Sequence, residues 1–171
     1  MSDEAVEESS KVLRSGYIGQ GEKVEEFESS LKSFFGFDYV STTNSATSAE
    51  MLIYHMLKKK AVFKLKSPFS NEIINIQWDG LNDQDEVLAT PLTCTATNWP
   101  ILANNLKLKW VDTCPITLGP DLNDLRRKIT EKAKLISIVH WGGYPIDLKK
   151  IFSIQLETFK KFGFWPLVIE D

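Results

Sequence analysis

Glu86-Val-Leu-Ala-Thr90 is the first of three β-prone runs, and it is followed by Leu106-Lys-Leu-Lys-Trp-Val111 and Lys134-Leu-Ile-Ser-Ile-Val139. A segment with helical signals follows each run, and a fourth run, Pro166-Leu-Val-Ile169, comes later. Strands that alternate with helices form βαβ units, which place helices on both faces of a parallel sheet. The sequence therefore predicts a three-layer α/β/α fold with a mainly parallel sheet.

Two helical segments show the spacing of an amphipathic helix. Asp121-Leu-Asn-Asp-Leu-Arg-Arg-Lys-Ile129 places apolar residues at i, i+3 and i+7, behind an aspartate suited to be the N-cap. The segment from Gly21 to Gly36 has the same spacing, which predicts a helix with one buried stripe that ends at Gly36. The stripe consists of Val24, Phe27, Leu31, Phe34 and Phe35.

The composition is that of an ordinary globular protein. The 171 residues are 43% apolar and 25% charged, with a net charge of −3, so we expect one domain with no attraction to nucleic acid. No apolar run is long enough to span a membrane, and neither a signal peptide nor an anchor is visible. Only Cys94, Cys114 and two histidines are present, which argues against a disulfide framework or a metal site and favours the reducing cytoplasm.

A hydroxyl-rich turn, Ser41-Thr-Thr-Asn-Ser-Ala-Thr-Ser48, follows the strand-like pair Tyr39-Val40 and precedes a segment with helical period. The helical period is carried by Ala49, Leu52, Ile53 and Met56. Two interpretations are open. The hydroxyls can simply cap the helix, or they can add donors to an anion site at its N-terminus.

The stretch from Leu57 to Gln84 is less regular and is expected to be an insertion or excursion. It contains a basic run made by Lys58, Lys59, Lys60, Lys64 and Lys66. A phosphate-binding patch is one interpretation of these lysines, and a solvated C-terminal end of a helix is the other.

Ligands of open parallel sheets bind beyond the carboxyl ends of the strands, so the residues that follow each strand are candidate site residues. They are Asn44-Ser-Ala-Thr-Ser48, Thr93-Cys-Thr-Ala-Thr97, Asp112, His140 and Asp171. His140 is open to two interpretations, a hydrogen-bonded core histidine or a catalyst.

Several common catalytic motifs are missing. Asn44-Ser-Ala-Thr-Ser48 lacks the Gly-Lys-Ser/Thr ending of a nucleotide-binding loop, and the glycines of Ser15-Gly-Tyr-Ile-Gly-Gln-Gly21 do not have dinucleotide-loop spacing. No Gly-x-Ser-x-Gly elbow is present either. The residues alone indicate an anion-binding α/β domain.

An ordered set of motifs resembles the DegT/DnrJ/StrS-type, fold-type I, pyridoxal-phosphate-dependent sugar aminotransferases. The motifs follow the family's order: Ser15-Gly-Tyr-Ile-Gly-Gln-Gly-Glu-Lys-Val-Glu-Glu-Phe-Glu28, Asn44-Ser-Ala-Thr-Ser-Ala49, Asp85-Glu-Val-Leu88, Thr93-Cys-Thr-Ala-Thr-Asn98, Trp110-Val-Asp112, Val139-His-Trp-Gly-Gly-Tyr-Pro-Ile-Asp-Leu148 and Val168-Ile-Glu-Asp171. Each motif is weak alone, and the order of the set gives the resemblance its weight.

The resemblance implies a cofactor, pyridoxal phosphate, and a role for several residues. Ala46 and Thr47 fall on the turn that holds the 5′-phosphate, and Asp171 falls on the carboxylate that pairs with the pyridine nitrogen. Cys94 stands where the family places an aromatic residue against the ring. Further cofactor contacts are expected from three residues: Ser45, Thr97 and His140.

The same resemblance implies an incomplete catalytic set. The family's Schiff-base lysine lies in a Ser-x-x-Lys segment well beyond the Glu-Asp pair, and the chain ends at Asp171. Residues 1–171 are therefore expected to be the N-terminal part of the cofactor-binding large domain, without the C-terminal small domain and without turnover of their own.

The activity implied for the parent protein is transfer of an amino group, typically from glutamate, to a nucleotide-linked keto-sugar by a homodimer, in amino-sugar and polysaccharide biosynthesis. Two alternatives stay open: a related sugar dehydratase with histidine in place of the lysine, or a non-catalytic domain that binds a phosphate ligand or a partner chain.

Overall fold

The computed structural model describes every residue from Met1 to Asp171 and divides into two compact units, residues 1–44 and residues 45–171. The chain contains no helix with the length and apolar character needed to cross a membrane. Apart from Asn44, the last residue of the first unit, the predicted site residues belong to the second unit.

The first unit consists of two helices, α1 (Asp3–Ser15) and α2 (Glu22–Phe35). Gly16 and Gly36 end them in the left-handed conformation, with φ of 74° and 69°, as C-cap glycines do. The helix and its stop at Gly36 are therefore confirmed, but the predicted burial of its stripe is wrong, because no residue of α2 is buried. Two helices alone offer no further layer to cover an apolar stripe.

The second unit is built on a parallel four-stranded sheet in the order β4-β3-β5-β6. The strands are β3 (Glu86–Ala89), β4 (Lys107–Trp110), β5 (Ala133–Ile138) and β6 (Leu167–Glu170). All four predicted runs form strands of this sheet, which confirms the mainly parallel α/β fold.

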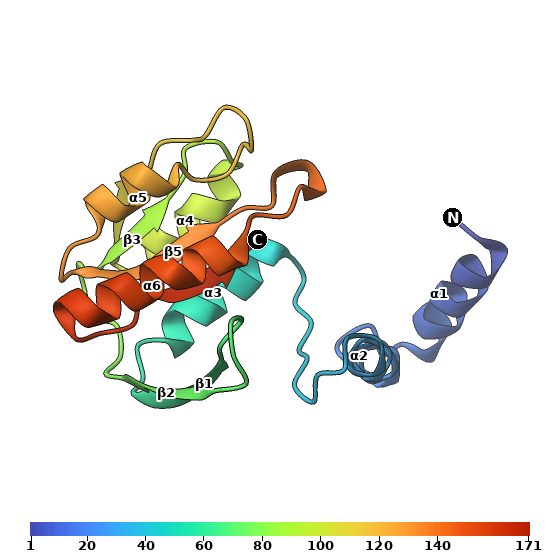
Figure 1. The fold of residues 1–171 in the computed structure, drawn as a ribbon. Helices are drawn as coiled ribbons and strands as arrows, with labels where there is room; N and C mark the ends of the chain where they lie inside the picture. The colour runs from blue at the N-terminus through green and yellow to red at the C-terminus, as the bar shows by residue number, and fades with distance from the viewer. The chain divides into compact units, whose positions relative to one another are not determined.

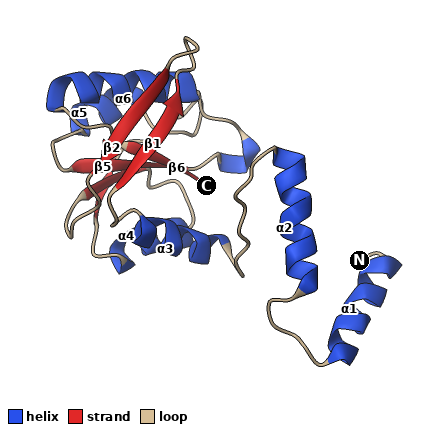
Figure 2. Ribbon diagram, turned by 90° about the horizontal axis from the view of Figure 1, so that it is seen from below, coloured by secondary structure: helices blue, strands red, loops and turns tan.

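Helices cover both faces of the sheet (Figures 1 and 2). They are α3 (Ala46–Met56) and α4 (Thr95–Ala103) on one face, and α5 (Leu122–Lys128) and α6 (Leu148–Phe162) on the other. One core joins Tyr54 and Ile101 to the sheet, and the other joins Leu125 and Ile151 to its opposite face. The predicted three layers are therefore present, and a single-turn helix η1 (Trp141–Gly143) follows β5.

The strand order reverses between β3 and β5. The chain leaves β3 through α4 to reach β4 on one side, then returns through α5 to β5 on the other side of β3. Right-handed crossovers in opposite directions put α4 and α5 on opposite faces, which opens a crevice at the carboxyl ends of the two central strands. The loops after β3 and β5 therefore lie at the usual ligand-binding position of such a sheet.

The stretch from Leu57 to Gln84 is more regular than predicted, because it folds as an antiparallel hairpin of β1 (Ala61–Lys66) and β2 (Ile73–Trp78). Side chains of β1 alternate between partly buried and exposed, so Lys64 and Lys66 occupy exposed positions of this strand. Because these lysines follow three others, the alternation typical of a strand was not recognised in the sequence. Conversely, Tyr39-Val40 forms no strand.

Candidate functional site

The N-terminus of α3 supports both interpretations of the hydroxyl-rich turn. Ser45 is the N-cap residue, and its Oγ accepts a hydrogen bond of 3.1 Å from the backbone nitrogen of Ser48. Ala46 and Thr47 are the first two residues of the helix, where backbone amides have no acceptor within the helix. Capping by Ser45 therefore leaves amide donors for an anion at the positive end of the helix dipole.

Asp171 lies at the carboxyl end of β6, where Figure 1 marks the end of the chain. Its backbone continues the parallel pairing with β5, because its nitrogen donates to Ile138 and its oxygen accepts from His140, both at 2.9 Å. Its Oδ2 accepts a hydrogen bond of 2.6 Å from Thr97 Oγ1. The sheet and α4 together fix this carboxylate at the crevice.

A second hydroxyl extends this contact towards the loop after β3. Thr93 Oγ1 donates to Thr97 Oγ1 at 3.1 Å. Thr93 also borders a cavity of about 620 Å³ together with Thr47, Trp99 and Trp110. Predicted residues from α3, the loop after β3 and the end of β6 are thereby linked through Thr93 and Thr97.

His140 contributes its backbone to this arrangement, and its ring is held by other groups. Nδ1 accepts from the backbone nitrogen of Ile146, and Nε2 lies 3.1 Å from Glu170 Oε2. Since Nδ1 accepts, the neutral ring carries its proton on Nε2 and donates it to Glu170. These two contacts hold the imidazole between the loop before α6 and the end of β6.

Two other candidates, Cys94 and Asp112, take no part in the side-chain hydrogen bond between Thr97 and Asp171. Cys94 is the N-cap residue of α4 and is exposed beside Thr93. Asp112 follows the edge strand β4, where its backbone nitrogen donates to Asp124. No group of three or more His, Cys, Asp or Glu side chains in the molecule could hold a metal ion.

The helix predicted from the spacing of Ala49, Leu52, Ile53 and Met56 is confirmed as α3, but two buried polar residues of this helix were not predicted. Leu52 and Met56 are 53% and 67% exposed, whereas Glu50 is 6% exposed and Tyr54 is fully buried. Burial and the charge of Asp171 raise the pKa of Glu50 to about 7. The available signal was the position of Glu50, four residues after Ala46 and four before Tyr54, on one helix face.

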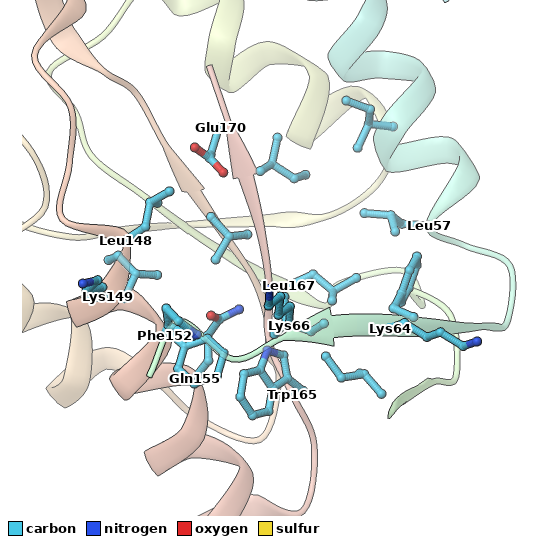
Figure 3. Close-up of a pocket in the computed structure, with 18 residues that line it drawn as sticks. Leu57, Lys64, Lys66, Leu148, Lys149, Phe152, Gln155, Trp165, Leu167 and Glu170 are labelled. Carbon is cyan, nitrogen blue, oxygen red and sulfur yellow. The ribbon is translucent and has the colours of Figure 1, made fainter. Parts of the chain in front are cut away.

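An apolar cavity of about 570 Å³ lies elsewhere, between the β1–β2 hairpin, α6 and β6 (Figure 3). Phe152, Trp165 and Leu167 form much of its wall, and Lys64 and Glu170 border it. None of the predicted site residues lines it. Its walls are largely apolar, and Lys64, Lys66 and Lys149 are among the residues that line it.

Comparison with known proteins places the chain in a family. Residues 1–158 match the sequence model of the DegT/DnrJ/EryC1/StrS aminotransferase family. The chain belongs to this family. The resemblance drawn from the motifs is therefore confirmed.

Solved structures agree with the DegT/DnrJ/EryC1/StrS assignment. AtS13 from Actinomadura melliaura is 40% identical, with a TM-score of 0.83 over 99% of this chain and 40% of that chain. The sugar aminotransferase CalS13 from Micromonospora echinospora is 35% identical, with a TM-score of 0.81 over 100% of this chain and 41% of that one.

One curated relative is named as a dehydratase and not as an aminotransferase. GDP-4-keto-6-deoxy-D-mannose 3-dehydratase of Yersinia pseudotuberculosis is 28% identical over 144 residues, which are 84% of this chain and 33% of that protein. The chain spans about a third of the length of the curated relatives it matches, with 33% and 34% for two others.

Proposed function

We propose that residues 1–171 form the N-terminal, cofactor-binding part of a pyridoxal-phosphate-dependent transaminase that acts on a nucleotide-linked keto-sugar. The hydrogen bond between Thr97 and Asp171 carries the proposal, because it holds the carboxylate at the end of β6 against α4, the helix that follows β3 at the switch point of the sheet. The family match and the likeness to a sugar aminotransferase support the reaction class. Glutamate is the proposed amino donor, and the parent protein is a cytoplasmic homodimer of amino-sugar and polysaccharide biosynthesis.

The residues present fit pyridoxal phosphate at both of its ionic groups. The amides of Ala46 and Thr47, with the hydroxyls of Thr47 and Ser45, suit the 5′-phosphate at the N-terminus of α3. Asp171 suits a protonated ring nitrogen, because Thr97 occupies only its Oδ2. Cys94 stands where the family's aromatic residue would be and offers the ring a small, polarisable contact.

Asp171, Thr97 and Thr93 would act together on the ring nitrogen of the bound cofactor. Pyridoxal phosphate, when bound, supplies a ring that accepts the electrons released as a C–H bond breaks. Asp171 favours the protonated ring nitrogen because an opposite charge stabilises the charged form. Thr97 holds that carboxylate in one orientation, and Thr93 donates to Thr97 in turn. The lysine that holds the cofactor covalently is contributed, in this proposal, by sequence outside residues 1–171.

Titration with pyridoxamine phosphate tests the site without requiring a lysine. We expect the 171-residue chain to bind it, and Asp171→Asn and Thr47→Ala each to weaken binding roughly tenfold, about 1.4 kcal/mol. Asp112→Asn is the matched control, since it makes the same change after the edge strand β4. Absent binding, or binding insensitive to both site variants, would leave a domain that binds another phosphate ligand or a partner chain.

A sugar dehydratase is the second candidate, because the relative from Yersinia pseudotuberculosis has that activity. Sequencing the gene beyond the codon for Asp171 distinguishes the two. A later Ser-x-x-Lys supports the transaminase, and histidine at that lysine supports the dehydratase. An immediate stop codon would contradict both.

Association of the chain is tested by light scattering. Large apolar side chains such as Phe34 and Met56 are 81% and 67% exposed, which favours self-association. We expect association of the 171-residue chain in the micromolar range, and a monomer throughout that range would contradict this self-association.

A further inference from the structure

Glu50 is a buried carboxyl group that the proposed function leaves without a role. It is 6% exposed, and its Oε1 is fully buried without a hydrogen-bond partner. A buried unpaired carboxyl group is costly, and structures retain few of them. Tyr54 lies one turn further on the same face, and its hydroxyl is also buried, with only the Ser137 hydroxyl nearby. The inner face of α3 is therefore polar where a helix against a sheet is normally apolar.

The charge that Glu50 faces is that of Asp171. Burial first, and then the negative charge of Asp171, raise the pKa of Glu50 to about 7. Burial also raises the pKa of Tyr54 to about 12, and Glu50 and Asp171 add to the rise while the nearby Ser137 hydroxyl opposes it. Three titratable groups thus influence one another at the carboxyl end of the sheet.

No cation compensates these groups. The helix packed against α3 is α4, Thr95–Ala103, which contains no charged residue. Charged groups on the neighbouring strands are engaged elsewhere: Glu86 with Lys107 and Lys109, Glu170 with His140, and Lys134 over the ring of Phe164. A cation placed beside Asp171 would therefore also be attracted by Glu50.

We propose that Glu50 is a positioning residue that acts with Asp171, so that the two carboxyl groups together hold the cofactor's ring nitrogen in its protonated form. The proposal rests on the proposed function, because it requires the ring nitrogen to lie at Asp171. Glu50 acts through space by its charge, and Asp171 makes the direct contact. The coupling is reciprocal: an ionised Glu50 favours the ring cation, and the ring cation favours an ionised Glu50 by the same amount.

The test uses pyridoxamine phosphate labelled with ¹⁵N in the ring, bound to the 171-residue chain and followed by NMR as the pH is raised. The measured quantity is the pH at which the bound ring nitrogen loses its proton. We expect Glu50→Gln to lower this midpoint by about one pH unit, a tenfold change in the protonation equilibrium. Asp171→Asn should lower it further. Tyr54→Phe is the matched control on the same helix face and should leave the midpoint unchanged.

A second measurement needs no variant. The carboxyl carbon of Glu50, followed by ¹³C NMR in the wild-type chain, should titrate about one pH unit lower with pyridoxamine phosphate bound than without it. Equal midpoints in both states, or equal ring midpoints in the wild type and Glu50→Gln, would overturn the role of Glu50. Failure of the wild type to bind, or binding unaffected by Asp171→Asn, would instead overturn the proposed function.

Discussion

Glu86, at the start of β3, and Glu50, on α3 within reach of the charge of Asp171, are equally buried carboxyl groups, and their surroundings differ completely. Each is 6% exposed. Glu86, at the start of β3, accepts hydrogen bonds from Lys109 and Thr130, both at 2.9 Å. Burial opposes its ionisation, but these partners outweigh it and hold the pKa of Glu86 below its ordinary value. The pKa of Glu50 moves the other way, to about 7. The amino end of the sheet is thus electrostatically satisfied, and the carboxyl end is left ready for a cation.

The largest expected effect is on the pH dependence of the chain's stability, and it comes from Glu50. The pKa of Glu50 rises from 4.5 to about 7 on folding, so the folded chain retains a proton that the unfolded chain releases between these values. Stability is therefore greatest below the unfolded pKa and is lost as the pH rises through the folded pKa. We expect the loss to be on the order of 2 to 3 kcal/mol, and Glu50→Gln to remove it.

Urea unfolding at pH 5 and pH 8 measures this effect. The variant should gain stability relative to the wild type between the two pH values. Parallel behaviour of the two proteins would show that Glu50 is ionised at little cost, which would remove the contrast with Glu86.

Substitution of Glu86, the carboxyl group with hydrogen-bond partners, should change the stability of the folded chain in the opposite direction to substitution of Glu50. Glu86→Gln removes the ionic partner of Lys109 and should destabilise the chain by about 2 kcal/mol at pH 7. Because the folded pKa of Glu86 is lowered, its contribution is present above the unfolded pKa and is lost as the pH falls through the folded one. The difference between the two proteins should therefore shrink on acidification.

Chemical denaturation at pH 7 and at pH 4 checks this prediction. Asp83→Asn is the control, because Asp83 forms an ion pair with Lys58 at 3.3 Å but is 63% exposed. The control should change stability by less than about 1 kcal/mol. Equal losses in both variants would mean that burial adds nothing to the Glu86 pairing.

Thr97→Val tests the hydrogen bond that orients Asp171, the carboxylate beside which the cation is expected to bind. Valine keeps the shape of threonine but cannot donate to Asp171, so the carboxylate loses its fixed orientation. We expect pyridoxamine phosphate to bind about threefold to tenfold more weakly, about 1 kcal/mol. Thr95→Val, on the same turn of α4 and exposed, should bind as the wild type does. Calorimetric titration gives both values, and identical affinities would show that Thr97 does not orient the site.

The smallest expected effect is that of Tyr54→Phe. The Tyr54 hydroxyl is buried with only the Ser137 hydroxyl nearby, so its removal loses at most that one contact and relieves the cost of burying the group. We expect stability within about 0.5 kcal/mol of the wild type, or slightly above it. A loss larger than about 1 kcal/mol in thermal unfolding would show that the Tyr54 hydroxyl makes a hydrogen bond with the nearby Ser137 hydroxyl.

The sequence predicted the sheet well because its strands are apolar runs bounded by polar turns. The period of two failed at Lys64 and Lys66, where long charged side chains on an exposed strand resemble a basic helix end. On α2, the period of 3.6 predicted the helix correctly but could not say what covers its stripe, since burial depends on partners that periodicity does not contain.

The candidate site was predictable only in part. Residues that follow strands, such as Thr97 and Asp171, can be found from the topology rule, and the resemblance implied their contact with a cofactor. The hydrogen bond between Thr97 and Asp171 joins positions that are 74 residues apart, which no local pattern encodes. Glu50 was missed because a glutamate in an amphipathic helix is normally assigned to the solvent face, and only the packing of α3 reveals it as buried.

The long separation between Thr97 and Asp171 also makes the site a reporter of folding order. Contacts between distant parts of a chain close slowly, because the intervening segment must be organised first. Asp171 reaches Thr97 only after β6 has paired with β5, and that pairing requires α6 to have crossed the sheet. Ligand-binding competence should therefore appear with the last step of sheet assembly, later than the helical signal, in a refolding experiment that follows both.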